Sequence, residues 1–535
     1  MELLKRSFKS FSQKEKGLGV FLLVIWMLSG TWLYFGTEAG SSAQSKVYNE
    51  GVVGQIQHIN PVFTELSEAD ADIASLVFSG LVKYNSETGE FEEDMATHTL
   101  SENQLTYTFT LKNDLFWQDG VELTAKDLYY TFHDVIQSED FENPILKSNF
   151  DGVKVEMPNS RSLIFTLGTP NSFFFTGLSV GILPEHILGQ VPVAELDTNE
   201  FNQNPIGSGP YKVKDSYQMN SDGSTSVVLA RSDSYYGDSG GLEQIRFIAY
   251  PSLDELIAHR DVWHGAARMR ASILDEVNLD DLVAHQYELP QYTALFINTD
   301  MPIFSKNSAR LALAQGIDKS ELLKAIGYKV TIETPILELS ELKGAPTFDL
   351  AAAKALLSES GFDSTQVVRL LRRDFSGSNE VQENIMKKTS DLLISQLAAM
   401  GITLKVETAS DSDLEQRIAK RDYELLLYGQ SLGYNLDTFS FWHSSQSQEG
   451  GLNLSNYSNP KADALIEKIR STFDDEERHE DLELLAQVIS KDVPAVFLYT
   501  PSYYYLVDSK LTGFDFKKLL LPKDRFANIS EWLFN

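Results

Sequence analysis

The chain has 535 residues, which exceeds the usual size of a single domain and predicts two or three compact units. Its hydrophobic content of 42% is enough to build cores and excludes wholesale disorder. A net charge of −31 argues against nucleic acid as a partner, and the lack of cysteine excludes disulfides, thiolate metal sites, a cysteine nucleophile and a lipid-modified cysteine.

The N-terminal segment carries a strong physical signal. Residues 1–16 have a local net charge of plus three, and residues 17–36 (GLGVFLLVIWMLSGTWLYFG) run for 20 residues without a charge. A helix of that length spans the roughly 30 Å hydrocarbon layer of a bilayer. We therefore expect an uncleaved anchor with its basic flank in the cytoplasm, then a polar linker over residues 37–46 and an extracytoplasmic chain. A signal peptide cleaved after the small residues Ser41 to Ala43 is the alternative.

The rest of the chain shows both strand-like and helical periodicity. Alternating residues predict strands at Leu105–Leu111 and Ser162–Leu167. Helical spacing predicts helices at Ala351–Gly361, with Asp349 as the N-cap and the glycine as the C-cap, and at Ala462–Phe473. Because strands and helices interleave without strict βαβ regularity, we expect more than one α/β or α+β domain.

Two short motifs suggest a serine nucleophile. GLSVG, Gly177–Gly181, matches the elbow of α/β-hydrolases around Ser179, and GDSGG, Gly237–Gly241, matches the chymotrypsin-like signature around Ser239. The first motif would need a strand before the serine and a helix directly after it. The second lies between two strand-like runs, where glycine and aspartate suit a turn. An envelope serine hydrolase remains the alternative function, with a connecting turn as the favoured interpretation of GDSGG.

The segment Ser431–Ser445 (SLGYNLDTFSFWHSS) concentrates aromatic and polar side chains. An apolar cleft with a few placed polar groups is built from such residues, and a buried core is built from the same aromatics. Its candidate residues are Tyr434, Asn435, Asp437, Phe439, Phe441, Trp442 and His443.

Ordered motifs along nearly the whole chain resemble the family 5 extracytoplasmic solute-binding proteins, which are peptide- and nickel-binding receptors of ABC importers. The run FTLKNDLFWQDGVELTAKDLYYTF, Phe109–Phe132, is similar to the family's W-x-D-G and T-A-x-D elements. GILPEHIL, NPIGSGPYKV, ALFINTDMPIF and NLSNYSNPKADALIEKI follow in the family's order. The segment YYGDSGGLEQIRF also falls on the family pattern, which places Ser239 in a variable turn.

The resemblance implies a two-lobed periplasmic-binding-protein-like α/β fold of type II, with an extra domain, behind the N-terminal transmembrane helix. The first lobe would take residues 47–84, 205–265 and 500–535. The extra domain would take residues 85–204, and the second lobe residues 266–499.

The resemblance also implies ligand-binding positions. Peptide receptors of the family commonly carry G-W-x-A-D-Y, whose aspartate pairs with the peptide ammonium, whereas this chain reads GQSLGY. A buried ammonium needs a charged partner, so Asp437 or Glu65 would have to replace the missing acid. The expected ligand-binding residues are Glu65, Gln430, Gly433, Tyr434, Asp437, Trp442 and Asn453.

The implied function is capture of a solute between closing lobes and delivery to a membrane permease. Peptides are the expected ligand, with nickel chelates, haem or oligosaccharides as alternatives. No P-loop is present, so a separate ATPase subunit would drive transport. We expect no catalytic residue, metal or cofactor in the chain, and a monomeric receptor that partners an ABC permease and ATPase and is held at the membrane by its N-terminal helix.

Overall fold

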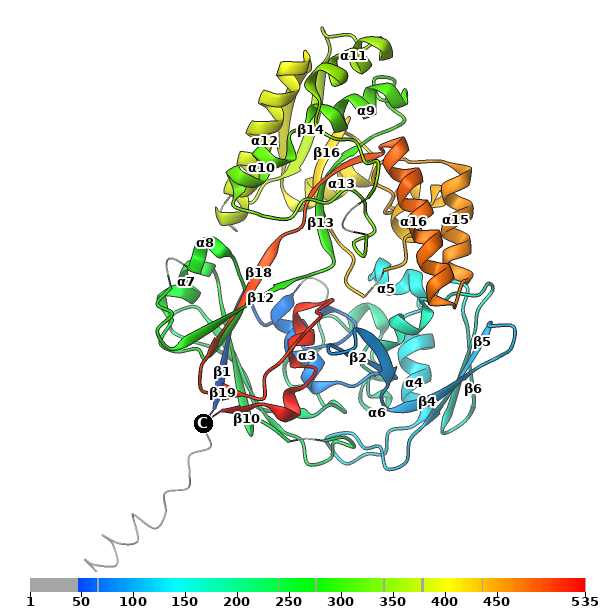
Figure 1. The fold of residues 1–535 in the computed structure, drawn as a ribbon. Coiled ribbons are helices and arrows are strands. Elements are labelled where there is room, and N and C mark those ends of the chain that lie inside the picture. Colours follow the sequence, from blue (N-terminus) through cyan, green and yellow to red (C-terminus); the bar gives the residue numbers. More distant parts are fainter. Residues whose placement is uncertain are drawn as a thin grey trace, which may run out of the picture. The chain divides into compact units, whose positions relative to one another are not determined.

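A computed structural model describes residues 47–64, 67–238, 240–274, 277–339, 342–376, 380–434 and 436–534. Residues 48–535 form one compact unit of mixed α/β structure (Figure 1). The expected membrane anchor, residues 17–36, lies outside the described residues. Within the described ranges, no helix is long and apolar enough to cross a membrane.

A seven-stranded mixed sheet has the order β12-β18-β11-β1-β10-β9-β8. Strand β1 pairs in parallel with β10 and β11, while the other neighbours are antiparallel. The sheet therefore combines the first strand of the unit with strands from the middle and from the end of the chain. The strands are β1 (Tyr48–Val53), β8 (Tyr211–Met219), β9 (Thr225–Arg231), β10 (Gln244–Tyr250), β11 (Gly265–Met269), β12 (Leu282–Glu288) and β18 (Ser502–Asp508).

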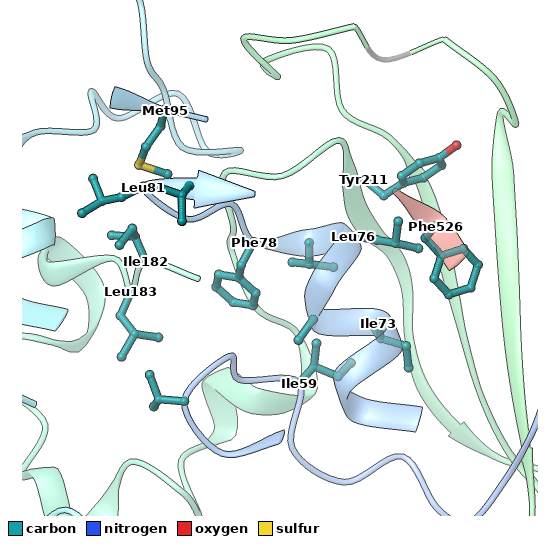
Figure 2. Close-up of a cluster of buried hydrophobic side chains, with 14 of the residues drawn as sticks. Ile59, Ile73, Leu76, Phe78, Leu81, Met95, Ile182, Leu183, Tyr211 and Phe526 are labelled. Atoms are coloured by element: carbon teal, nitrogen blue, oxygen red, sulfur yellow. The ribbon is translucent and has the colours of Figure 1, made fainter. Parts of the chain in front are cut away.

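The central strands of this sheet have a buried core on each face. Alternate residues of β10 point to opposite faces, so that Phe247 joins one core and Ile248 another. Helix α3 (Glu68–Val77) packs on the first face, and its N-cap is Ser67, whose hydroxyl accepts from the amide of Asp70. Figure 2 shows this core around α3. On the second face, α7 (Leu253–Ala258) packs against the sheet.

A five-stranded sheet has the order β15-β14-β16-β13-β17 and lies between two layers of helices. In β13, Leu295 packs against α9 to α12, whereas Phe296 packs against α13 to α16. The strands are β13 (Gln291–Ile297), β14 (Val367–Arg373), β15 (Thr403–Ala409), β16 (Leu425–Ser431) and β17 (Ala495–Tyr499). The helices are α9 (Asn307–Gly316), α10 (Lys319–Ile326), α11 (Leu350–Ser360), α12 (Glu380–Met400), α13 (Asp411–Ala419), α14 (Phe439–Trp442), α15 (Pro460–Ser471) and α16 (Asp475–Asp492).

The chain passes between these two sheets at two short connections. Residues 289–290 join β12 to β13, and residues 500–501 join β17 to β18. The expected boundary of the second lobe lay at residue 266, but β11 and β12 still belong to the seven-stranded sheet. The sheet assignments therefore put the passage at residue 289, and the remaining lobe boundaries stay predictions.

A third, four-stranded antiparallel sheet, β4-β5-β7-β6, occupies residues 96–166, inside the range expected for the extra domain. Its strands β5 and β7 confirm the two strands predicted from alternation, because Phe109 and Phe165 point into one core. The neighbouring elements are β2 (Val82–Asn85), β3 (Glu90–Glu93), β4 (Ala96–Leu100), β5 (Thr106–Leu111), α4 (Ala125–Tyr129), the π-helix η2 (Tyr130–Val135), α5 (Pro144–Asn149), β6 (Lys154–Asn159), β7 (Ser162–Thr166), the 3-10 helix η3 (Phe174–Ser179) and α6 (Glu185–Leu188).

The end of the chain returns to the first sheet. Strand β18 leads to the 3-10 helix η7 (Pro522–Phe526), which contacts α3, and Phe526 joins the core around α3 (Figure 2). The last elements are β19 (Leu511–Thr512), the 3-10 helix η8 (Ile529–Glu531) and β20 (Leu533–Phe534).

Candidate functional site

A cavity of about 400 Å³ lies where segments far apart in the sequence meet. Its walls come from α3 and the segment after it, from residues 235–238 before β10, and from η7 and the residues that follow. Tyr434, which follows β16, also lines the cavity. It belongs to the segment between the two connections, which carries the five-stranded sheet. Most of the cavity wall thus comes from outside residues 291–499, and Tyr434 is the lining residue that comes from inside that range.

Tyr434 is positioned by a tight turn and by aromatic neighbours. Gly433 before it has φ +51°, a left-handed conformation that glycine adopts easily. The Tyr434 ring lies with its centroid 5.0 Å from that of Phe91 and 5.9 Å from that of Tyr84. Its hydroxyl donates a hydrogen bond to Asp524, and burial, then Asp524, raise the pKa of this phenol.

Asp524 is fully engaged by neighbouring donors. Its Oδ2 accepts from the amides of Leu520 at 2.9 Å and Leu521 at 2.7 Å, and its Oδ1 accepts from Tyr434. Burial raises the pKa of this carboxyl, against the effect of these donors. The aspartate thus joins η7 to the segment after β16 rather than presenting a free carboxylate to the cavity.

Lys523, next in the same helix, also lines the cavity. Its Nζ lies 5.2 Å from the centroid of the Tyr434 ring, within the range of a cation–π contact. Burial lowers the pKa of this ammonium, although Asp524 and Asp72 act in the opposite direction. The arrangement places a positive charge on the cavity wall.

A second polar group lies around Asp94. This carboxyl is buried, and burial raises its pKa, with the charges of Lys83 and Lys112 acting against the shift. The Tyr236 hydroxyl is itself buried and meets the geometry of a hydrogen bond with none of the described residues. All four residues line the cavity, which therefore carries donors and charges of both signs.

The predicted site residues lie in different surroundings in the structure. Of the predicted set, the structure places Tyr434 on the cavity wall, and Glu65 lies outside the described residues. Gln430 is buried in β16, where its side-chain oxygen accepts from the Tyr292 hydroxyl. A Cβ on Gly433 would lie 3.1 Å from the Leu521 side chain, so this position faces η7.

Asp437, Trp442 and Asn453 have partners within the protein. The Asp437 carboxylate forms an ion pair with Arg470 Nε at 2.9 Å and accepts from an amide at 3.0 Å. Trp442 is buried in the core below the five-stranded sheet. Asn453 Nδ2 donates to the Tyr457 carbonyl at 2.8 Å, and its Oδ1 accepts from the amide of the same residue. The binding role predicted for these residues stays a prediction.

The two serine motifs have ordinary local structures. Ser179 ends η3, and its hydroxyl donates to the Thr176 carbonyl at 2.9 Å, so the strand that a hydrolase elbow requires before it is missing. GDSGG lies between β9 and β10, as the turn interpretation predicts, and Asp238 accepts from the Gly240 amide at 2.9 Å. Ser239 itself lies outside the described residues.

Comparison with known proteins decides the family. A model described as "Bacterial extracellular solute-binding proteins, family 5 Middle" matches residues 90–451. The chain belongs to this family. Its members are solute-binding proteins rather than enzymes, in agreement with the resemblance found in the sequence.

Individual relatives support this membership over nearly the full length. The chain is 26% identical over 540 residues to the oligopeptide-binding protein AppA of Bacillus subtilis, covering 92% of each protein. A solved structure of AppA from Bacillus subtilis in complex with a nonapeptide has a TM-score of 0.74 and 25% identity, covering 92% of this chain and 99% of that one. The nickel-binding protein NikA of Staphylococcus aureus is 22% identical over 475 residues, covering 84% of this chain and 88% of that protein.

Sequence reasoning missed the charged groups at the end of the chain. Lys523 and Asp524 lie in a run that resembles an ordinary surface segment, and nothing in the sequence links them to Tyr84 or Tyr434. They meet only because η7 packs on α3 and beside the turn after β16. Within the described residues, no cluster of three or more His, Asp and Glu side chains has a metal-binding arrangement.

Proposed function

We propose that this chain is the substrate-binding receptor of an ABC importer and that it captures peptides in the cavity bounded by α3, η7 and Tyr434. The observation that carries the proposal is the position of this cavity, which is lined by residues outside 291–499 and, from inside that range, by Tyr434. A ligand that contacts both sets of residues favours the conformation in which they approach, and this conformation is the one that a permease would recognise.

Peptides are the proposed ligand class for two reasons. The relative AppA is an oligopeptide-binding protein and has been solved with a nonapeptide. The cavity also offers charges of both signs and phenol hydroxyls, which suit a ligand with an ammonium, a carboxylate and amide groups.

The proposed setting is the outer side of the cytoplasmic membrane. Residues 17–36 would hold the receptor there, and a permease with a separate ATPase would receive the ligand. N-terminal sequencing of the protein from cells checks the anchor, because a mature N-terminus near Gln44 would contradict it.

The binding role is checked with the purified full chain and a mixed library of three- to nine-residue peptides. We expect native mass spectrometry to detect bound peptides, and calorimetry with a bound peptide to give a saturable isotherm. At a peptide concentration of 100 times the Kd, the free energy of unfolding should rise by about 2.7 kcal/mol.

Two outcomes would decide against the proposal. Binding of a nickel chelate with no peptide binding would reassign the ligand class. Hydrolysis of peptides that is abolished in Ser179→Ala or Ser239→Ala, with peptide affinity unchanged, would instead favour the hydrolase alternative.

A further inference from the structure

Two polar groups of the cavity lining, both near Tyr434, have no hydrogen-bond or ion-pair partner among the described residues. The Lys523 ammonium forms no hydrogen bond or ion pair with any of the described residues, and its neighbour is the Tyr434 ring. The Tyr84 side chain is only 7% exposed, and its buried hydroxyl makes no hydrogen bond with that part of the chain. Both residues line the cavity. A buried hydroxyl without a partner costs free energy, so it marks a place where an external group is expected.

The nearby carboxylates do not fill this place. Asp524 accepts three hydrogen bonds, from two amides and from Tyr434. Asp72 is held by Arg525, whose Nη1 donates to Asp72 Oδ1 at 2.9 Å. The two acids therefore lower the cost of a positive charge at Lys523 without forming an ion pair with it.

Tyr84 and Lys523 belong to different elements and both lie near the Tyr434 ring. Tyr84 lies in β2, Lys523 lies in η7, and the Tyr434 ring is close to both. The Tyr84 hydroxyl is near enough to Asp524 that the carboxylate acts with burial to raise the pKa of this phenol to about 12. The hydroxyl therefore keeps its proton at neutral pH and is available as a donor.

We propose that the Lys523 ammonium and the Tyr84 hydroxyl form a subsite for a carboxylate of the bound ligand, so that the receptor selects peptides with a free C-terminal carboxyl group or an acidic side chain. This inference rests on the proposed function and specifies it. A carboxylate accepts from a cation and a hydroxyl at once, and charge-assisted bonds of this kind are stronger than neutral ones.

The cavity lining carries further charged groups around Asp94. Lys83 and Lys112 are exposed and interact with Asp94, whose buried carboxyl also has Tyr236 beside it. Glu93 is bound to His98, with an Oε1 to Nδ1 distance of 2.9 Å. Lys523 differs from these two lysines because it is less exposed and lies against the Tyr434 ring.

The test compares matched peptides on the purified full chain. A library of three- to nine-residue peptides without Asp or Glu is made as free acids and as C-terminal amides, and binding is measured by competition and native mass spectrometry. We expect the wild type to prefer the acids by about 10- to 100-fold. Amides that carry one Glu in place of Gln separate the two sources of a carboxylate, because they regain affinity only if a side chain occupies the subsite.

Variants assign the preference to these residues. Lys523→Met should remove the preference for a carboxylate, and Lys523→Arg should keep it. Tyr84→Phe keeps the ring and should reduce acid affinity by roughly 3- to 10-fold. Lys324→Met removes an exposed lysine of α10 outside the cavity lining and should change nothing.

The outcomes separate the two proposals. If acids and amides bind equally, and Glu and Gln amides also bind equally, the subsite is wrong while the receptor function stands. If no peptide binds in any form, both proposals are wrong. Circular dichroism checks whether Lys523→Met folds. If it does not, Lys523→Arg and Tyr84→Phe still test the subsite. A preference for free acids that Tyr84→Phe leaves intact would exclude the Tyr84 hydroxyl.

Discussion

His264 is a half-buried histidine whose structure requires the neutral ring. Its Nδ1 accepts from the amide of Asn49 at 2.9 Å, and its ring centroid lies 4.4 Å from that of Phe534. An N–H can donate only to an unprotonated nitrogen, so protonation at Nδ1 would break this bond between β1 and the start of β11. Burial lowers the pKa of His264 below 6.5, with Asp508 acting in the opposite direction.

This geometry predicts a loss of stability on mild acidification. Because the folded pKa is below the unfolded value, the unfolded state takes up the proton first as the pH falls. The stabilisation is complete above about pH 6.5 and is lost as the pH falls through the folded pKa. Urea unfolding should therefore give a lower free energy of unfolding at pH 5.5 than at pH 7.5, with part of the difference due to this group. His264→Asn should reduce that difference, whereas His479→Asn, at an exposed position, should not.

Peptide receptors of the family commonly carry an aspartate at the position of Gly433, and this chain lacks it. The sequence made Asp437 a reasonable substitute, because it follows the GQSLGY element closely. In the structure Arg470 of α15 forms an ion pair with it, and the guanidinium stacks 4.3 Å from the centroid of the Phe439 ring. This pairing depends on how α14 and α15 pack, which local sequence patterns do not encode.

At the scale of elements, η7 is held to β1 and α3 by one buried arginine. Arg525 Nη2 donates to Glu50 at 2.8 Å, and the same guanidinium binds Asp72. Tyr505 of β18 donates to Glu50 at 2.9 Å. Residues of β1, α3 and β18 thus meet around the Arg525 guanidinium. We expect this network to hold η7, and with it the cavity wall, in place.

Loss of that arginine should be costly. Arg525→Met leaves two buried carboxylates without their counterion, and we expect the free energy of unfolding to fall by about 3–5 kcal/mol. Lys517→Met, at an exposed position of the same segment, should change it by less than about 0.5 kcal/mol. Urea denaturation of both variants measures the difference. Equal stability of the two variants would show that the network contributes little.

Elements with strong local signals were predicted well. The helix expected at Ala351–Gly361 is α11, with Asp349 accepting from two amides and Gly361 at φ +75°. The helix expected at Ala462–Phe473 is α15, which begins two residues earlier at Pro460. Caps and periodicity are local properties and can be seen in sequence. Trp442 and Tyr434 come from one aromatic segment, yet one lies in a core and the other on the cavity wall, because long-range packing decides their surroundings.

At the scale of the whole molecule, residues 291–499 have cores of their own. The two cores on either face of the five-stranded sheet consist of buried residues from this range alone, with Phe173 packed at the edge. The ends of the range lie on neighbouring strands, since Thr293 pairs with Tyr499. A segment with its own core and adjacent ends has the properties of an independent folding unit.

We therefore expect residues 291–499, expressed alone, to fold. The isolated segment should unfold cooperatively in urea and give a dispersed NMR spectrum. The remaining residues, joined by a short glycine linker between 288 and 502, should keep the seven-stranded sheet. A broad, non-cooperative transition of the isolated segment would show that its fold depends on contacts across the two connections.

Both connections between the sheets contain a proline. Leu289 precedes Pro290 in one, and Thr500 precedes Pro501 in the other. The ring fixes φ of each proline near −65°, and the residue before it is confined to extended conformations. Any rotation of one sheet against the other would therefore have to use the few remaining torsion angles of these two connections. Such a rotation would be restricted to nearly a single direction.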